Sequence, residues 1–400
     1  MTTHLPSTPS GLRLRFIRED APAGDLLLTV FLRGAADGLN IVVPHGDTDY
    51  YRQRPNLAIV RPDDRSADPG DRCLDLDGFF GLHPALAPLL PAWQARHLAC
   101  VHACGAPDES RSHFRAMELM ERGVASETGP ASGWIARHLA TRADDAPSPL
   151  RALAWGTAPQ RSLSGAGPVA TLRDLQEIQL AREPRQAARL SHLIDSLYNV
   201  EPGPLEAIGR ESLQLSARLQ HISLDPSSDL PYPPTEFGRG LQQLACLVRA
   251  DAGVEAAAID LGGWDTHYAQ GGAKGVMARQ LAELASGLAA FHEDLAPFWA
   301  RLSVVVMTEF GRRVKENGSL GTDHGHGSVM LILGGHVAGG KVHGTWPGLA
   351  AYDLVGPGDL AVTTDYRDLL AELCLRRLRN SALDQIFPGF TPTTRDVFVA

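Results

Sequence analysis

This chain has few aromatic residues and no excess of basic side chains that could bind a polyanion. Its 400 residues include 37 Lys and Arg against 46 Asp and Glu, which gives a formal net charge of -9 at pH 7. Such a balance provides no basic field for holding a nucleic acid or an anionic membrane surface. We therefore expect neither as a partner. The acidic residues could instead bind cations.

Cysteine pairs with metal or redox spacing are also missing. The five cysteines are an odd number, and no two of them form a C-x-x-C motif, so we expect reduced, mostly buried thiols. No apolar run is long enough to span a bilayer, and the first 20 residues contain neither the apolar segment of a signal peptide nor a twin arginine. These features predict a cytoplasmic protein.

What the chain does have is a regular alternation of short apolar, β-branched runs with longer helical patterns. This order predicts βα units and a largely parallel sheet. The expected strands are residues 25–32, 97–103, 150–156, 255–261, 301–308 and 329–335. The expected helices are residues 84–95, 112–122, 133–143, 236–251, 275–298 and 366–379.

Residues 172–230 differ from the rest, because they show helical periodicity with no strand between the helical stretches. The segment ends in the proline-rich sequence DPSSDLPYPPTE. It is predicted to be a helical insertion. It either covers a site as a cap or packs as a pair of helices at the margin of the sheet.

Polar residues follow the strand-like segments. In parallel α/β sheets the loops after the strands converge on one edge, where ligands collect. We therefore expect one shared site there. The polar residues are Asp37 and Asn40 after the first strand, Ser110, Ser112 and His113 after the second, Asp265 and His267 after the fourth, Glu309 after the fifth, and Asp323, His324 and His326 in the next loop.

The spacing of these residues suits metal binding. Asp265 and His267 are two positions apart, so in an extended segment both point to one face and can share a cation. Asp323 and His324 are adjacent, so they serve either two neighbouring ions or one ion from a bent loop. They lie in LGTDHGHGSVMLILGG, where glycines allow close backbone approach. The alternative for this stretch is a solvated turn before a strand.

Ser112 opens a predicted helix, where the positive end of the helix favours an alkoxide. The ordinary alternative is an N-cap. Arg111 and Arg312 are candidates for binding an oxyanion, although loop arginines commonly form structural salt bridges. His343 is a further ligand candidate. His113 has no predicted role beyond its place after the serine.

Several stretches resemble the family called domain of unknown function 1501. The resemblance runs in order over nearly the whole chain. The matching stretches are LRGAADGLNIVVPHGDTDYYRQRP, DGFFGLHPALAPLLPAW, SRSHFRAMELMERG, GGWDTH, TEFGRRVKENGSLGTDHGHG, GTWPGL and TTDYR. This family is placed in the alkaline phosphatase superfamily, beside sulfatases and cofactor-independent phosphoglycerate mutases. The resemblance implies a single domain over residues 1–400, folded as a three-layer α/β/α sandwich with its metal site at the carboxyl edge.

The resemblance also implies roles for single residues. Asp37 is similar to the acidic ligand after the first strand, and Ser112 to the nucleophile. Asp323 with His324 resembles the D-H-G ligand pair of the superfamily.

Asp265 and His267 resemble the ligands of a second ion, although the superfamily spacing D-x-x-x-H is D-x-H here. The last histidine ligand of the superfamily site is matched here by either His326 or His343. The sulfatase motif C-x-P-S-R is absent, which argues against a formylglycine sulfatase.

Together these features predict a metal-dependent hydrolase or transferase that acts on a phosphate, sulfate or related ester. Ser112 attacks in line, and Arg111 or Arg312 neutralises the charge that builds up. The substrate is then a small anionic ester. One or two divalent ions are expected, with zinc preferred over magnesium, calcium or manganese. The alternative is an accessory subunit that binds metal without hydrolysis and serves a protein partner that the sequence does not identify.

Overall fold

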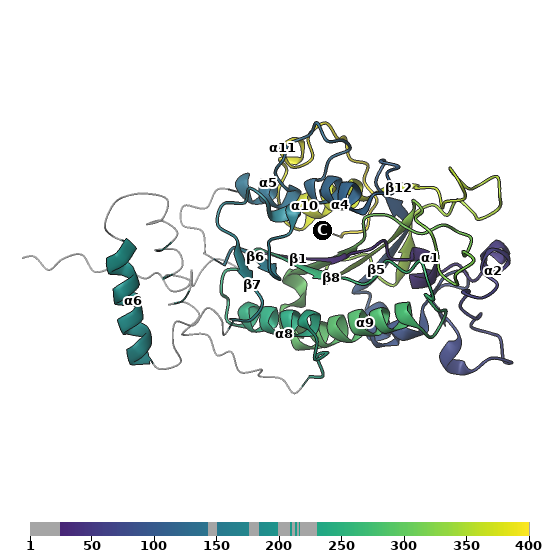
Figure 1. The fold of residues 1–400 in the computed structure, drawn as a ribbon, viewed down its shortest axis with the longest axis horizontal. Coiled ribbons are helices and arrows are strands. Elements are labelled where there is room, and N and C mark those ends of the chain that lie inside the picture. The colour runs from purple at the N-terminus through teal and green to yellow at the C-terminus, as the bar shows by residue number, and fades with distance from the viewer. Residues whose placement is uncertain are drawn as a thin grey trace, which may run out of the picture.

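A nine-stranded sheet forms the centre of the part of the chain that the computed structural model describes, which is residues 25–142, 150–175, 184–198 and 230–399 with the single positions 209, 213 and 216. The strand order is β11-β5-β10-β9-β1-β8-β6-β7, and β12 pairs with β5 (Figure 1). The strands are β1 (Leu26–Leu32), β5 (Leu98–Gly105), β6 (Ala152–Trp155), β7 (Ala170–Leu172), β8 (Ala256–Leu261), β9 (Leu302–Met307), β10 (Ser328–Gly334), β11 (Lys341–His343) and β12 (Thr364–Asp365).

The sheet is mostly parallel, as predicted. Strand β1 pairs in parallel with β8 on one side and with β9 on the other. Strand β10 is antiparallel to both of its neighbours, β9 and β5. Because β9 and β10 are antiparallel, the loop 308–327 that joins them lies at the carboxyl edge of β9. This loop therefore meets the loops that follow β1, β5 and β8.

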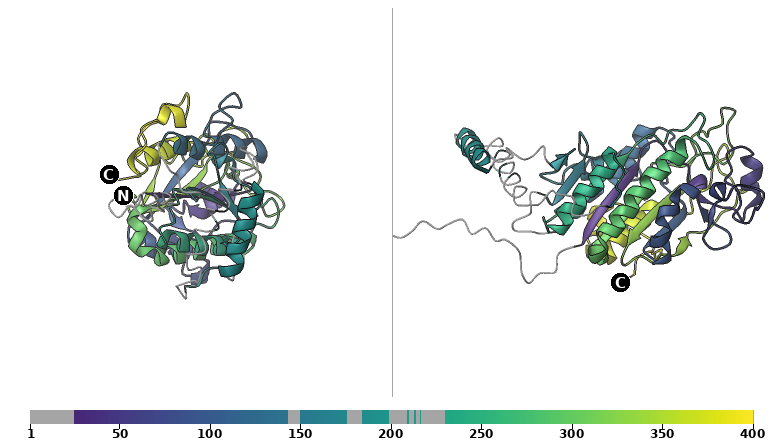
Figure 2. Two further views of the ribbon diagram at one scale, coloured as in Figure 1. Left: turned by 90° about the vertical axis from the view of Figure 1, so that its left-hand side faces the viewer. Right: turned by 90° about the horizontal axis from the view of Figure 1, so that it is seen from below.

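Helices cover both faces of the sheet (Figures 1 and 2). One face packs against α8 (Glu236–Arg249), α9 (Val276–Asp294), the 3-10 helix η2 (Pro84–Leu89) and α3 (Leu90–Gln94). The other face packs against α4 (His113–Arg122), α5 (Trp134–Ala140), α10 (Tyr366–Arg376) and α11 (Leu383–Ile386). Successive residues of β1 enter opposite cores, since Leu28 and Val30 belong to the first and Leu27 and Phe31 to the second.

A small antiparallel sheet is formed by β2 (Val42–Val43), β4 (Gly81–Leu82) and β3 (Leu74–Asp75), in that order. It is accompanied by two short helices, α1 (Gly38–Ile41) and α2 (Thr48–Gln53), and by the 3-10 helices η1 (Pro69–Asp71), η3 (Arg161–Leu163) and η5 (Ala296–Arg301) elsewhere. All six predicted strands and all six predicted helical stretches are confirmed, with boundaries that differ by a few residues. Strands β7, β11 and β12 were not predicted, because two or three residues are too few to show a period.

The predicted insertion at 172–230 is only partly described. Helix α6 (Pro184–Tyr198) lies within it and is helical as expected. Most of the remainder falls outside the described residues, as does the amino-terminal stretch used for the localisation argument. Within the described parts, no helix combines the length and apolar character needed to cross a bilayer.

All five cysteines are unpaired and buried, as expected for thiols of the core. Burial raises the pKa of the Cys73 thiol to about 12, and the same cause raises the pKa of the other four. A protonated, inaccessible thiol is a poor nucleophile and a poor metal ligand. The cysteines therefore belong to the core.

Asp37 is the centre of a buried polar network where β1 leads into α1. The Arg54 guanidinium donates to both carboxylate oxygens, from Nη1 at 2.5 Å and from Nη2 at 2.9 Å, and neither side chain is exposed. Gln270 donates a third hydrogen bond at 2.7 Å. Arg54 also bonds the Asn40 side chain and the Val314 carbonyl. The network thus joins the first loop to two distant segments at the carboxyl edge.

Removing one partner of this ion pair should be costly, because it leaves a buried, uncompensated charge. We expect Asp37→Ala to lower the free energy of unfolding by about 3–5 kcal/mol in a urea titration. The control is Asp49→Ala, which removes the half-buried partner of the exposed Arg52 and should cost less than about 1 kcal/mol. Equal losses in the two variants would contradict the structural role of Asp37.

Candidate metal centre

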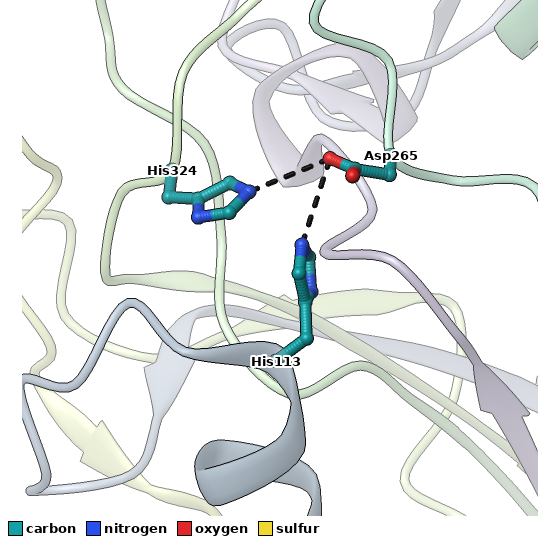
Figure 3. A group of neighbouring side chains, drawn as sticks. All are labelled: His113, Asp265 and His324. Atoms are coloured by element: carbon teal, nitrogen blue, oxygen red, sulfur yellow. Dashed lines mark hydrogen bonds and ion pairs between the residues drawn. The ribbon is translucent and has the colours of Figure 1, made fainter.

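Three side chains from separate parts of the chain meet at the carboxyl edge of the sheet (Figure 3). His113 is the first residue of α4, Asp265 lies in the loop after β8, and His324 lies in the loop between β9 and β10. Their ligand atoms all lie within 4.8 Å of one another. The Asp265 Oδ1 atom is 3.6 Å from His113 Nε2 and 3.4 Å from His324 Nε2. In Figure 3 both imidazole rings point toward this oxygen.

His267 adds a third imidazole to the cluster. Its Nε2 atom lies 3.2 Å from Asp265 Oδ1 and 2.9 Å from His324 Nε2. The cluster therefore presents three imidazole nitrogens of the same kind around one carboxylate oxygen. Histidine and carboxylate are the ligand types that zinc and related transition metals favour.

The Nδ1 atom of each imidazole faces a hydrogen-bond acceptor. His113 Nδ1 is 2.8 Å from a Glu309 oxygen, His267 Nδ1 is 3.3 Å from Asp323 Oδ1, and His324 Nδ1 is 2.9 Å from the Arg111 carbonyl oxygen. Acceptors at Nδ1 select the tautomer that carries its hydrogen there. The Nε2 lone pairs are then free to bind an ion, which is the arrangement found behind metal-binding histidines.

The distances from the carboxylate oxygen are close to those around a single tetrahedral ion. Bonds of about 2.0–2.1 Å place the corners of a tetrahedron about 3.3–3.4 Å apart. The carboxylate oxygen lies 3.2, 3.4 and 3.6 Å from the three nitrogens. In addition, the Nε2 atoms of His267 and His324 face each other at 2.9 Å. Two unprotonated lone pairs at that separation repel each other unless a cation or a proton lies between them.

Glu309 holds His113 in place. Its carboxylate is buried and also accepts hydrogen bonds from the Gly34 amide and the Thr308 hydroxyl, both at 2.9 Å. Burial alone would raise the pKa of Glu309, but the hydrogen bonds from His113, the backbone and Thr308 outweigh it and lower the pKa. In return, the hydrogen bond to Glu309 raises the pKa of His113 despite partial burial. Glu309 is therefore an ionised partner behind the imidazole.

Arg312 holds Asp265 and the surrounding loops. Its side chain is fully buried and donates to the carbonyl oxygens of Gly34, Ala35, Trp264 and Thr322. It also donates to Asp265 Oδ1 at 2.7 Å. Burial would raise the pKa of Asp265, but the hydrogen bond and charge of this guanidinium lower it. Arg312 thus faces the protein, and the structure gives it no exposed surface for a substrate.

Glycines let the loop 308–327 fold back on itself. A Cβ atom on Gly325 would lie 2.3 Å from the Arg312 carbonyl carbon, and one on Gly321 would lie 2.4 Å from the His267 carbonyl carbon. Either contact is closer than atoms tolerate, so only glycine fits. The close approach places His324 and His267 side by side. The glycines around the histidines therefore have a steric cause.

The cluster is open to solvent on one side. The side chains of Asp265 and His267 are 51% and 43% exposed, whereas those of His113 and His324 are each 20% exposed. His113 stacks on Phe310, with ring centroids 5.1 Å apart. The cluster is thus partly buried on the side of His113 and His324 and faces solvent on the side of Asp265 and His267.

The structure brings together only some of the predicted metal ligands. Asp265, His267 and His324 join the cluster. Asp323 lies behind His267 instead of facing the other ligands. Its Oδ1 contacts His267 Nδ1 and accepts a hydrogen bond from Asn317 at 3.1 Å. Asp37 is not in the cluster, because both of its oxygens are engaged by the network described above.

The two remaining histidine candidates are also outside the cluster. His326 Nε2 is 2.9 Å from the Ala106 carbonyl oxygen, and His343 Nε2 is 2.8 Å from the Ala338 carbonyl oxygen. A carbonyl oxygen can only accept, so both Nε2 atoms carry hydrogen and offer no lone pair to a metal.

Ser112 and Arg111 lie beside the cluster along the chain. Ser112 is the N-cap residue of α4, is exposed, and makes no side-chain capping hydrogen bond. Arg111 is half-exposed and forms an ion pair with the buried Asp359. The Ser110 hydroxyl accepts a hydrogen bond from the Ser112 amide at 3.2 Å. Ser112 therefore has a free hydroxyl and lies between Arg111, whose carbonyl binds His324, and His113 of the cluster.

Sequence reasoning missed two members of this site. His113 was assigned no role of its own, and Glu309 was noted only for following a strand. The available signal was that each is the first or second residue after an element boundary at the carboxyl edge. Which residue would face which loop depends on the pairing of β9 with β10, and no local pattern reports that pairing.

Comparison with known proteins gives a family match and distant structural similarities. No curated protein matches the chain in sequence. The crystal structure of Ps i-CgsB in complex with k-i-k-neocarrahexaose is similar with a TM-score of 0.39 and 9% identity, covering 92% of this chain and 74% of that chain. The structure of Ps i-CgsB alone gives a TM-score of 0.37 and 8% identity over the same shares.

The family match covers most of the chain. The model described as "Protein of unknown function (DUF1501)" matches residues 25–381, which include every residue of the cluster and each residue that positions it. The chain belongs to the DUF1501 family.

Proposed function

We propose that this protein is a metal-dependent hydrolase that acts on a phosphate, sulfate or related ester. The observation that carries the proposal is the convergence of three imidazole Nε2 atoms on the Asp265 carboxylate, each imidazole being held through Nδ1. Such preorganised nitrogen ligands at the carboxyl edge of a parallel sheet are typical of a catalytic metal site. We also propose a place for the family in the alkaline phosphatase superfamily, on the strength of the resemblance stated above.

The ligand types favour zinc over magnesium or calcium. Three imidazoles and one carboxylate form a borderline-soft set, whereas magnesium and calcium prefer oxygen ligands. His113, Asp265 and His324 would hold one ion, and His267, which lies against Asp265 and His324, would be a further ligand. When bound, the ion supplies Lewis acidity that polarises an ester oxygen and lowers the pKa of a neighbouring hydroxyl.

An anionic substrate is supported by the arginines beside the cluster. Arg111 and Arg313 are each 36% exposed, and both lie against the same buried carboxylate of Asp359. One carboxylate leaves the pair with a net positive charge. A half-exposed guanidinium retains donors for the oxygens of a phosphate or sulfate group.

Ser112 is the proposed nucleophile. Its hydroxyl is not used for capping, and the ten-residue helix α4 begins directly after it, so the positive end of the helix favours its ionised form. In the proposed step, Ser112 Oγ gives up its proton and bonds to the phosphorus or sulfur atom, while the bond to the ester oxygen breaks and that oxygen leaves as the alcohol after taking up a proton, so that no net proton is lost. Water then releases the inorganic anion and restores the serine.

A second function is favoured by the number of ligands. Catalytic zinc sites keep one position open, whereas structural sites use four protein ligands, and His267 beside the three residues of the cluster would supply a fourth. A protein that binds metal without hydrolysis, as an accessory subunit of an enzyme, would need no open position. Zinc bound with no turnover of 4-nitrophenyl phosphate, bis(4-nitrophenyl) phosphate or 4-nitrophenyl sulfate would favour this second function.

The metal site can be tested by replacing single histidines. We expect the purified protein to bind about one zinc ion and His324→Ala to lose it, because one of the few nitrogen ligands is gone. His326→Ala is the matched control. His326 lies two positions after His324 in the same loop, and its Nε2 donates to the Ala106 carbonyl oxygen instead of facing the cluster. Elemental analysis after equilibrium dialysis measures the zinc content. Similar zinc loss in both variants would refute the proposed ligand set.

The residues behind the imidazoles should tune metal affinity. Glu309→Gln keeps the shape of the side chain but removes the charge that holds His113 Nδ1, so we expect zinc to bind about 10- to 100-fold more weakly. Glu316→Gln is the control, because Glu316 lies on the same loop and binds Asn56 and Leu57 instead. Competition with a chelating dye gives both dissociation constants. Unchanged affinity in Glu309→Gln would remove Glu309 from the site.

Ser112→Ala separates the nucleophile from a structural serine. We expect it to abolish ester turnover while zinc content stays constant. The free energy of unfolding should change by less than about 0.5 kcal/mol, because no capping hydrogen bond is lost. Ser110→Ala should retain turnover. Full activity of Ser112→Ala would exclude a serine nucleophile at this position and point to attack by water.

A further inference from the structure

Exposed apolar side chains occur on the chain segments that carry the metal centre. Of the eight large hydrophobic side chains that the described residues expose, three lie on segments that carry the cluster, and two more lie on the segment before Asp359, which pairs with Arg111. These five are Phe114, Tyr268, Leu320, Tyr352 and Val355, and the other three are Leu193, Leu375 and Val399. Single exposed apolar residues are ordinary on protein surfaces, but their concentration on the segments that carry a ligand site is not.

Two of these side chains, Phe114 and Tyr268, directly follow cluster residues, and Leu320 lies four positions before His324 in the loop 308–327; we call the three the apolar rim. Phe114 follows His113 and is 87% exposed, and Tyr268 follows His267 and is 77% exposed. Leu320 is 52% exposed, and its carbonyl accepts a hydrogen bond from the Gln270 amide at 2.9 Å. The rim is thus fixed to the same loops as the ligands.

The backbone of the rim adds a second indication. Leu320 has φ 56° and Ala269 has φ 47°, which are left-handed values that L-residues rarely adopt. A branched side chain in this region costs on the order of 1 kcal/mol or more. Glycine would remove the strain, yet the sequence places an exposed leucine there. Strain of this kind collects at ligand-binding sites.

We propose that the substrate of the metal centre is an extended ester with two unlike parts, an anionic group and a ring-bearing or apolar body. This proposal rests on the proposed function. The anionic group meets the ion and Arg111, and the body lies on Phe114 and Tyr268. Aromatic side chains offer a large contact area and few rotatable bonds, so they bind ring faces at a small cost in entropy. A small ester such as methyl phosphate would leave the rim unused.

Two stable anions with the same head group test the role of the rim. Methylphosphonate and phenylphosphonate differ in the ring alone, and neither is hydrolysed. Calorimetric titration of the zinc-loaded protein should show tighter binding of phenylphosphonate. Phe114→Ala and Tyr268→Ala should each weaken phenylphosphonate binding by about 2- to 12-fold, the range that an aromatic contact of 0.5–1.5 kcal/mol gives. Methylphosphonate binding should not change.

Leu375→Ala is the control, since Leu375 is an exposed residue of α10 outside the rim. Its binding of both phosphonates should equal that of the original protein. Equal affinity of the original protein for the two phosphonates, or ring binding that survives in both rim variants, would overturn the proposal. So would failure of both phosphonates to bind to zinc-loaded protein.

Two further measurements keep the outcomes apart. Zinc content reports on the metal centre by itself, so a protein that binds no zinc would refute the proposed function. A protein that binds zinc but shows no preference for phenylphosphonate over methylphosphonate would refute only the role of the apolar rim. Analytical ultracentrifugation detects self-association. A dimer that Phe114→Ala and Tyr268→Ala convert to monomer would assign the rim to a subunit contact and overturn its role in substrate binding.

Discussion

The buried guanidinium of Arg312 is the interaction on which the rest of the site depends. It occupies the carboxyl edge of the sheet and binds four backbone carbonyl oxygens from the loops after β1, β8 and β9. A buried charge is tolerated only when its hydrogen bonds are satisfied. Here that requirement draws three loops to one point and orients Asp265 toward the imidazoles. Arg312 is a positioning residue, because its guanidinium donates its hydrogen bonds to backbone carbonyl oxygens and to Asp265 and offers none to a substrate.

The same principle governs the histidines. Each Nδ1 meets an acceptor, and the three acceptors come from a buried glutamate, an aspartate and a backbone carbonyl. The ring orientation and the tautomer are therefore set before any ion arrives. Such preorganisation reduces the entropy cost of binding. It also concentrates unshared lone pairs in a small volume, and a cation relieves their repulsion.

The topology of the sheet explains why these groups meet. Strand β10 runs against its neighbours, so the loop 308–327 turns back at the carboxyl edge and brings His324 beside α4 and the loop after β8. A parallel β10 would have required a crossover and carried its preceding loop to the opposite edge. One antiparallel strand in a mostly parallel sheet thus completes the candidate centre.

The sequence by itself determined the strands, the main helices and the edge at which polar residues collect, because hydrophobic period and strand ends are local properties. It also identified Asp265, His267 and His324. It did not determine that Asp37 pairs with Arg54, that Asp323 supports a histidine, or that His113 and Glu309 join the site. Those assignments depend on contacts between residues far apart in the chain. Only the packing of the loops decided which carboxylate meets a guanidinium and which meets an imidazole.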